Sequence, residues 1–151
     1  MSISPTRLWS TIGSEEALAE MSETACWFAL REESLGRIAI APAGIVDIFP
    51  VNYVIGHGAV YFRTAPGDKL LGLAVRPDVA FEIDGHDEEA AFSVVLKGVA
   101  ERVELQPEID AAEELPLQPW LPTPKYRWVR IMPREVTGRV FLRGPEPERF
   151  A

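Results

Sequence analysis

Residues 47–69, with the sequence DIFPVNYVIGHGAVYFRTAPGDK, constrain the fold more than any other part of the chain. Two apolar segments flank a Gly-His-Gly turn at 56–58, a pattern typical of antiparallel strands joined by a tight connection. An Ala-Pro-Gly loop then precedes a helix that we expect over about residues 68–75. The stretch therefore predicts a β-hairpin followed by a helix, with residue 69 in the first helical turn.

The composition predicts one acidic, turn-rich domain spanning residues 1–151. A 151-residue chain with 47% hydrophobic residues is large enough for its own core. Its 11 glycines and 13 prolines indicate many turns, as in a strand-rich fold. The formal net charge of −8 disfavours nonspecific binding to nucleic acid or to an anionic membrane. An anionic ligand would therefore have to be attracted by a local basic cluster.

The cysteine count and the N-terminus favour a soluble, cytoplasmic protein. Cys26 is the only cysteine, so no intrachain disulfide can form, and its apolar neighbours suggest a buried structural thiol. The sequence contains neither a signal-peptide core nor a run of about 18 apolar residues. Residues 1–13 are expected to form a loosely held arm, anchored by Leu8, Trp9 and Ile12, and residues 144–151 a tail.

Alternating apolar residues predict a mainly β fold with six to seven antiparallel strands in a small closed or split barrel. The expected strands are 37–41, 45–54, 59–64, 79–84, 92–103, 128–132 and 137–142, and the expected helices are 14–20, 23–33, 68–75 and 107–115.

Individual residues predict further details of these strands and helices. Gly98, in the middle of what we expect to be the longest strand, indicates a bend or bulge. Pro50 places its strand at a sheet edge or interrupts it, and apolar residues on both sides of that strand suggest that both faces are covered. The helix 23–33 should begin after Ser22 and bury Ala25, Phe28 and Ala29 on one face.

Basic residues around the hairpin suggest a site for a phosphorylated planar cofactor such as a flavin. Lys69 stands in a first helical turn, where a cation opposes the helix dipole unless an anion docks there. Arg63 lies across the loop from Lys69, and the strand interrupted at Pro50 leaves backbone groups free to bond a heterocycle near Asn52. A solvated lysine and an ordinary β-bulge are the alternatives.

No metal site is expected from the sequence. The acidic residues between Asp84 and Glu89 match no calcium-loop spacing, so they are interpreted as a solvated turn. His57 and His86 have no metal-ligating companions, and His57 is interpreted as a turn residue.

The ordered segments LGRIAIA, DIFPVNYVI, VYFRTAPGDKLLGLAVRPDVAFEID, FSVVLKGVAERV and VRIMPREVTGRV resemble the pyridoxamine 5′-phosphate oxidase-like family. Within it the chain is similar to the small flavin/deazaflavin oxidoreductases of actinobacteria. The resemblance covers about residues 35–140. It implies a split β-barrel homodimer with two FMN sites at the subunit interface.

The resemblance also implies roles for individual residues. Arg63 and Lys69 match positions near the flavin phosphate, and Thr64 belongs to the same motif. The strand containing Pro50, Val51 and Asn52 matches the one that lies along the isoalloxazine ring. The C-terminal region, from which the partner subunit usually completes the site, contains Trp120, Trp128 and Arg130.

The C-terminal sequence departs from true pyridoxamine phosphate oxidases, because TGRVFLRGPEPERFA lacks their arginine/histidine motif for the substrate phosphate. We therefore do not expect pyridoxine-phosphate oxidation. Three hypotheses follow: an FMN-dependent oxidoreductase, a reductase that uses the deazaflavin F420, and a non-catalytic protein that stores or senses a flavin. A flavin carries the redox chemistry itself, so the lack of a nucleophile cluster is compatible with the first.

Overall fold

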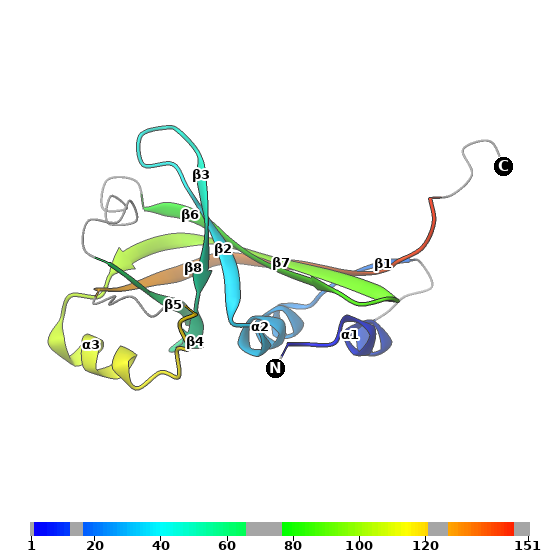
Figure 1. Cartoon of the computed structure of the whole chain (residues 1–151), viewed down its shortest axis with the longest axis horizontal. Coiled ribbons are helices and arrows are strands. Elements are labelled where there is room, and N and C mark those ends of the chain that lie inside the picture. Colours follow the sequence, from blue (N-terminus) through cyan, green and yellow to red (C-terminus); the bar gives the residue numbers. More distant parts are fainter. Residues whose placement is uncertain (1, 13–16, 66–76, 121–126, 147–151) are drawn as a thin grey trace.

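The computed structural model describes residues 2–12, 17–65, 77–120 and 127–146 (Figure 1). Within these ranges the elements are α1 (Pro5–Ile12), β1 (Leu18–Glu20), α2 (Glu23–Glu32), β2 (Leu35–Ile40), β3 (Asp47–Asn52), β4 (Val54–Gly56), β5 (Ala59–Thr64), β6 (Asp78–His86), β7 (Ala90–Arg102), α3 (Gln106–Glu113) and β8 (Arg127–Leu142).

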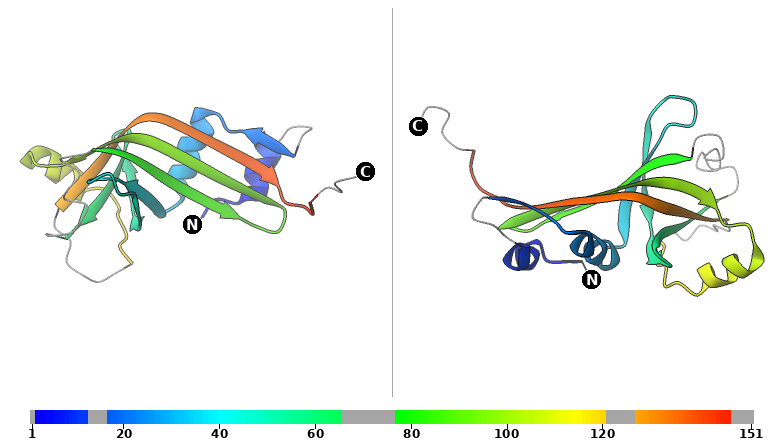
Figure 2. Two further views of the ribbon diagram at one scale, coloured as in Figure 1. Left: turned by 90° about the horizontal axis from the view of Figure 1, so that it is seen from above. Right: turned by 180° about the vertical axis from the view of Figure 1, so that it is seen from behind.

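The described strands form one eight-stranded antiparallel sheet in the order β3-β2-β6-β7-β8-β5-β4, with β1 added to β8. Figure 2 shows β6, β7 and β8 as long, curved ribbons with α1 and α2 on one face, while α3 lies beyond the opposite end. The β2–β3 hairpin crosses these ribbons steeply in Figure 1. This curled, mainly β half-barrel confirms the fold class that the sequence predicts.

The hairpin formed by β4 and β5 has the predicted tight turn. Gly56 pairs with Ala59, so His57 and Gly58 alone connect β4 to β5. Their φ angles of 51° and 74° lie in the left-handed region, as a two-residue type I′ turn requires. β5 spans the predicted residues, and its side chains alternate as expected between the main core and the face that carries Tyr61 and Arg63.

The ladder between β7 and β8 contains the bulge expected at Gly98. The register shifts between Lys97 and Gly98, and Gly98 pairs with Pro133. A Cβ on Gly98 would collide with the main-chain oxygen of Met132, so only glycine fits there. Two predictions are wrong here. β8 is one 16-residue strand rather than two, and it is longer than the 13-residue β7. The bulge explains the first error, since proline is tolerated where a ladder is already disrupted.

Helix α2 begins as predicted, with the Ser22 hydroxyl accepting a hydrogen bond from the Ala25 N–H at 3.1 Å. Cys26, Ala29 and Leu30 are fully buried, which confirms the buried thiol. The prediction that Phe28 is buried is wrong, because its side chain is 51% exposed. Phe28 falls outside the stripe formed by residues 26, 29 and 30, and a helix buries such a stripe rather than every apolar residue.

The N-terminal region differs from the sequence interpretation. Residues 18–20 were expected in a helix but form β1, which pairs with the far end of β8 and so satisfies backbone groups that an exposed strand edge would leave free. Residues 14–16 lie outside the described ranges. Part of the expected arm forms α1, where Leu8 is buried and Trp9 and Ile12 pack against the main core.

β3 lies at the sheet edge, as Pro50 predicted. The expectation that both faces of its strand are covered is wrong within this chain: Ile45, Val46 and Ile48 are 77%, 72% and 60% exposed. The expected helix 68–75, and Lys69 with it, lies outside the described residues. None of the described helices is long and apolar enough to cross a membrane.

Candidate functional site

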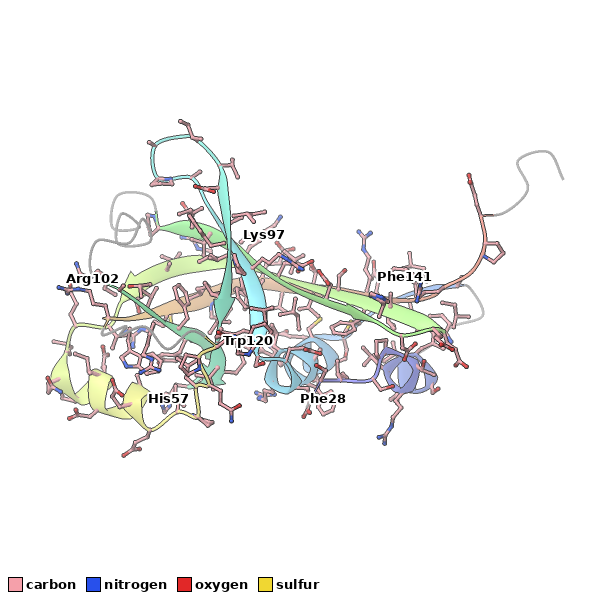
Figure 3. The ribbon with its side chains drawn as sticks, in the orientation of Figure 1. Phe28, His57, Lys97, Arg102, Trp120 and Phe141 are labelled. Atoms are coloured by element: carbon pink, nitrogen blue, oxygen red, sulfur yellow. The ribbon has the colours of Figure 1, made fainter. Side chains whose placement is uncertain are left out.

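A cavity of about 260 Å³ lies where β3 and β5 approach the segment that leaves α3. Five residues singled out from the sequence line it: Pro50, Val51, Asn52, Arg63 and Trp120. They come from three separate parts of the chain. The edge strand supplies the first three, β5 supplies the arginine, and the segment after α3 supplies the tryptophan, which Figure 3 labels.

The Asn52 side chain connects two of these parts. Its Oδ1 accepts a hydrogen bond from the backbone N–H of Trp120 at 2.9 Å, and its Nδ2 donates to the Ser34 carbonyl at 3.4 Å. Trp120 is 66% exposed, so its position beside the cavity depends on such tethers rather than on burial. The amide therefore fixes one wall of the cavity against the edge strand.

Among the described residues that line this cavity, Arg63 is the only charged one. Its Cζ lies 5.4 Å from the centroid of the Trp128 ring, within the range of a cation–π contact. Its Nε is buried and has no hydrogen-bond partner among the described residues. A buried donor without an acceptor is costly, so this nitrogen is suited to receive an acceptor from a ligand.

Trp128 packs behind Arg63 rather than lining the cavity. The indole is 3% exposed, and its Nε1 donates a 2.7 Å hydrogen bond to Oε1 of Glu113 on α3. Tyr61 meets the same ring edge-on, with 6.3 Å between centroids. The indole thus lies in a small second core whose members are Ala59, Tyr61, Val103, Ala112 and Trp128.

Thr64 and Arg130 lie away from the cavity lining. Thr64 is 1% exposed, and its Oγ1 has no hydrogen-bond partner in the described parts of the chain. Arg130 forms ion pairs with Glu101 at 2.5 Å and with Glu108 at 3.3 Å. The hydrogen bond to Glu101 raises the pKa of Arg130 above its already high usual value, so this guanidinium is committed to its own carboxylates.

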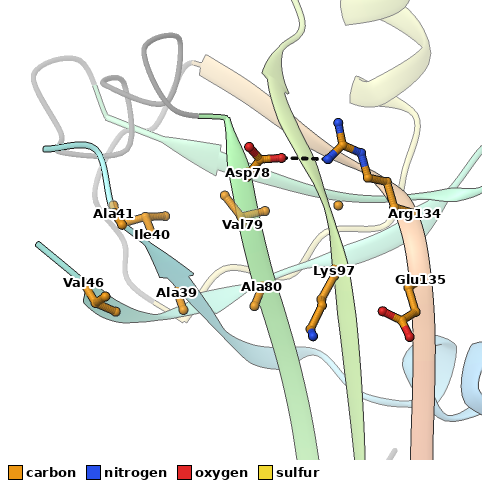
Figure 4. Close-up of a pocket in the computed structure, with 11 residues that line it drawn as sticks. Ala39, Ile40, Ala41, Val46, Asp78, Val79, Ala80, Lys97, Arg134 and Glu135 are labelled. Atoms are coloured by element: carbon orange, nitrogen blue, oxygen red, sulfur yellow. Dashed lines mark hydrogen bonds and ion pairs between the residues drawn. The ribbon is translucent and has the colours of Figure 1, made fainter. Parts of the chain in front are cut away.

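Three other cavities lie elsewhere in the described molecule, of which one, beside Trp128 and Arg102, is of similar size at about 270 Å³ and two are clearly larger. One of about 460 Å³ lies beside the β2–β3 hairpin, where Asp78 and Arg134 pair with each other at 2.8 Å (Figure 4). Another, of about 680 Å³, lies between α1 and α2. The 260 Å³ cavity is nevertheless the stronger candidate, because Arg63, with its unpaired Nε, lines it together with four other sequence-predicted residues.

Sequence reasoning missed three of the residues that line this cavity, Leu35, Leu117 and Pro119. The last two belong to the same proline-rich connection as Trp120, and this proximity was a usable signal. Leu35 begins β2 opposite Asn52 in the ladder, which only the strand register reveals. The Glu113–Trp128 contact joins a helix to a strand and leaves no trace in the sequence.

The curled antiparallel half-barrel places this protein in the class of split-barrel proteins. The sequence matches the pyridoxamine 5′-phosphate oxidase family over residues 22–140, and the chain belongs to this family. The fold is accordingly that of the pyridoxamine 5′-phosphate oxidase-like split barrels.

Solved structures support this assignment over nearly the whole chain. A Corynebacterium glutamicum protein, provisionally assigned as a pyridoxamine 5′-phosphate oxidase, is 42% identical, with a TM-score of 0.80 over 89% of this chain and 100% of its own. An FAD-binding protein from Mycobacterium smegmatis is 38% identical, with a TM-score of 0.72 over 82% of this chain and 98% of its own. The uncharacterized Mycobacterium tuberculosis protein Rv3129 is 42% identical over 90 residues, which are 60% of this chain and 82% of that protein.

Proposed function

We propose that this protein binds FMN in the cavity beside β3 and acts as a flavin-dependent oxidoreductase on a small molecule. The observation that carries the proposal is the convergence of the edge strand, Arg63 and Trp120 on one cavity. A bound flavin would supply the hydride or electron transfer, and the protein would supply binding, orientation and electrostatics.

Arg63 is the proposed phosphate ligand. Its guanidinium is a permanent cation in a protein of net charge −8, and its unpaired Nε can donate a charge-assisted hydrogen bond to a phosphate oxygen. We propose Lys69 as the second cation and Thr64, the next residue after Arg63, as part of the same phosphate-binding motif.

The remaining walls suit a planar ring. Pro50 and Val51 present apolar surface along the edge strand, and the exposed indole of Trp120 offers an aromatic face at the cavity. Asn52 holds the backbone of Trp120 in place by accepting the 2.9 Å hydrogen bond from its N–H. We propose that the isoalloxazine ring lies between the edge strand and the Trp120 segment.

We further propose that the protein is a homodimer whose second copy completes the site. A volume of about 260 Å³ falls below the roughly 300–1,000 Å³ typical of small-molecule sites, so one chain would enclose only part of a flavin. Ile45, Val46 and Ile48 expose apolar surface on the β2–β3 hairpin, as subunit interfaces do. A second copy would cover this surface.

Light scattering tests the dimer. The Ile48→Lys variant is expected to be monomeric at concentrations where the wild type is dimeric, because a buried lysine opposes association. Leu142→Lys, at the far end of β8 and 43% exposed, is the matched control and should remain dimeric. A dimeric Ile48→Lys protein would place the interface elsewhere.

FAD is a second candidate cofactor, because the 38% identical relative from Mycobacterium smegmatis is FAD-binding. F420 is less favoured, since its longer anionic tail would need an extended basic groove, and Arg63 is the only charged residue among the described residues that line this cavity. A non-catalytic flavin-binding protein would use the same residues. Reduction of the bound flavin by NADH, NADPH or reduced F420 would separate an enzyme from such a protein.

The absorption spectrum of the purified protein tests the proposal, together with mass spectrometry of the cofactor released on denaturation. We expect FMN in the wild type and a loss of affinity of at least about 100-fold in the Arg63→Ala/Lys69→Ala variant, since each lost charge-assisted hydrogen bond costs about 1.5–3 kcal/mol. Arg134→Ala, which removes an exposed arginine from another cavity, is the control. Unchanged flavin content in the double variant would contradict the proposal.

A further inference from the structure

The carboxylate of Glu113 on α3 is linked to the cavity by two consecutive contacts. Glu113 Oε1 accepts the hydrogen bond of the Trp128 indole at 2.7 Å, and the face of that indole supports the Arg63 guanidinium at 5.4 Å. Arg63 in turn lines the cavity. An acidic residue outside the cavity is thus connected to Arg63, the one charged residue among the described residues of the lining.

We propose that Glu113 is a positioning residue that sets the orientation of Arg63 toward the ligand's anionic group. This inference rests on the proposed function in one respect, namely that the anionic group is a flavin phosphate. Glu113 does not line the cavity and makes no contact with the ligand in this proposal.

Two physical effects pass along this link. Glu113 Oε1 is the acceptor of the Trp128 N–H, so removing it releases this 3% exposed ring from a fixed orientation. The guanidinium resting on the ring would move with it. In addition, a carboxylate that accepts the indole N–H polarises the ring and strengthens its attraction for the cation. Both effects hold the Nε of Arg63 in one place.

The structure contains a matched contact that lacks this link. Glu108 also lies on α3 and also bonds a residue of β8, Arg130, at 3.3 Å. Arg130 is held independently by Glu101 and does not line the cavity. Removing Glu108 therefore weakens the attachment of α3 to the sheet without disturbing the Trp128–Arg63 contact.

Calorimetric titration with FMN and with riboflavin, which lacks the phosphate, tests the inference. Glu113→Ala is expected to weaken FMN binding about tenfold and to leave riboflavin binding unchanged, and Glu113→Gln, which keeps an acceptor oxygen, should recover most of the loss. In an Arg63→Ala background Glu113→Ala should cause no further loss, and Glu108→Ala should leave both affinities unchanged.

Three results would overturn it: equal weakening of FMN and riboflavin binding, an undiminished effect in the Arg63→Ala background, or an equal effect of Glu108→Ala. A second measurement does not depend on flavin. The Arg63 Nε–H signal in the NMR spectrum, displaced by the Trp128 ring current, is expected to shift in Glu113→Ala and not in Glu108→Ala. An unshifted signal in Glu113→Ala would also overturn the inference. Absence of flavin binding by the wild type would instead contradict the proposed function.

Discussion

Among the described residues, the end of the sheet that carries α1, α2 and β1 pairs its buried polar side-chain atoms, whereas the end that carries β4, β5 and α3 does not pair all of them. At the first end Asp87 accepts hydrogen bonds from the Thr6 hydroxyl and from the backbone N–H groups of Thr6, Glu89 and Ala90. At the second, Arg63 Nε and Thr64 Oγ1 are buried without partners among the described residues. Both belong to β5.

The hydrophobic cores differ in the same way. The larger core contains buried side chains from α1, α2 and most strands, and its Tyr53 hydroxyl is satisfied by the Leu30 carbonyl at 2.6 Å. The smaller core contains an indole tied to a carboxylate and a guanidinium stacked on that indole. The first end therefore mainly stabilises the fold, while the second contains the groups that we propose bind the ligand. Substitutions at the first end should accordingly change mainly the free energy of unfolding, and substitutions at the second should change mainly the affinity for the ligand.

The largest expected effect is on stability, at the α1–α2 end. Leu30 is fully buried in the larger core, so Leu30→Ala should lower the free energy of unfolding by about 2–5 kcal/mol through lost burial and a residual cavity. Denaturant unfolding measures this change. Phe28→Ala, on the exposed face of the same helix, should change it by less than about 1 kcal/mol. A folded Leu30→Ala protein that had lost its cofactor affinity would contradict the inference that the α1–α2 end contributes stability and not ligand binding.

Local sequence signals predicted the parts of this structure that depend on local chemistry. The turn at His57 and Gly58, the edge position of Pro50 and the bulge at Gly98 each follow from the backbone restrictions of the residues involved. Alternation along β5 placed Arg63 on the face opposite the main core, and the structure brings it to the same cavity as Pro50 and Asn52.

Long-range pairing explains what local signals missed. Residues 18–20 form a strand because β8 extends far enough to pair with them, which their own composition does not reveal. The continuity of β8 through Pro133 depends on the register shift in its ladder with β7, where Arg134 of β8 has no paired residue. Glu113 reaches Trp128 only because α3 folds back against β8, so no spacing rule could have found this contact.

At the end of the sheet with the cavity, a substitution should lower the flavin affinity and leave the free energy of unfolding nearly unchanged. Asn52→Ala removes the acceptor of the Trp120 N–H and frees the segment that forms one cavity wall. Flavin affinity should fall about tenfold, because the wall must then be ordered on binding, while the free energy of unfolding should change by less than about 1 kcal/mol. Calorimetric titration and denaturant unfolding measure the two quantities. Gln106→Ala, which removes another exposed amide hydrogen bond, should leave affinity unchanged.

The smallest expected effect is the pH dependence contributed by Asp87 at the opposite end. The hydrogen bond from the Thr6 hydroxyl, followed by those from the backbone N–H groups of Ala90, Thr6 and Glu89, holds the pKa of Asp87 well below its usual range. Because the folded-state pKa is depressed, the unfolded state binds the proton first. The stabilisation is therefore present above the unfolded pKa of about 3.9 and is lost as the pH falls through the folded value.

Asp87→Asn should abolish this contribution while retaining one acceptor oxygen for Thr6. The unfolding free energy of the wild type, measured by denaturant titration from neutral to acid pH, is expected to decline more steeply below about pH 4 than that of the variant, since only the wild type takes up this proton. Parallel curves would show that the Thr6–Asp87 contact does not lower the carboxyl pKa. FMN affinity at neutral pH should be the same in both proteins, because Asp87 belongs to the end of the sheet that stabilises the fold.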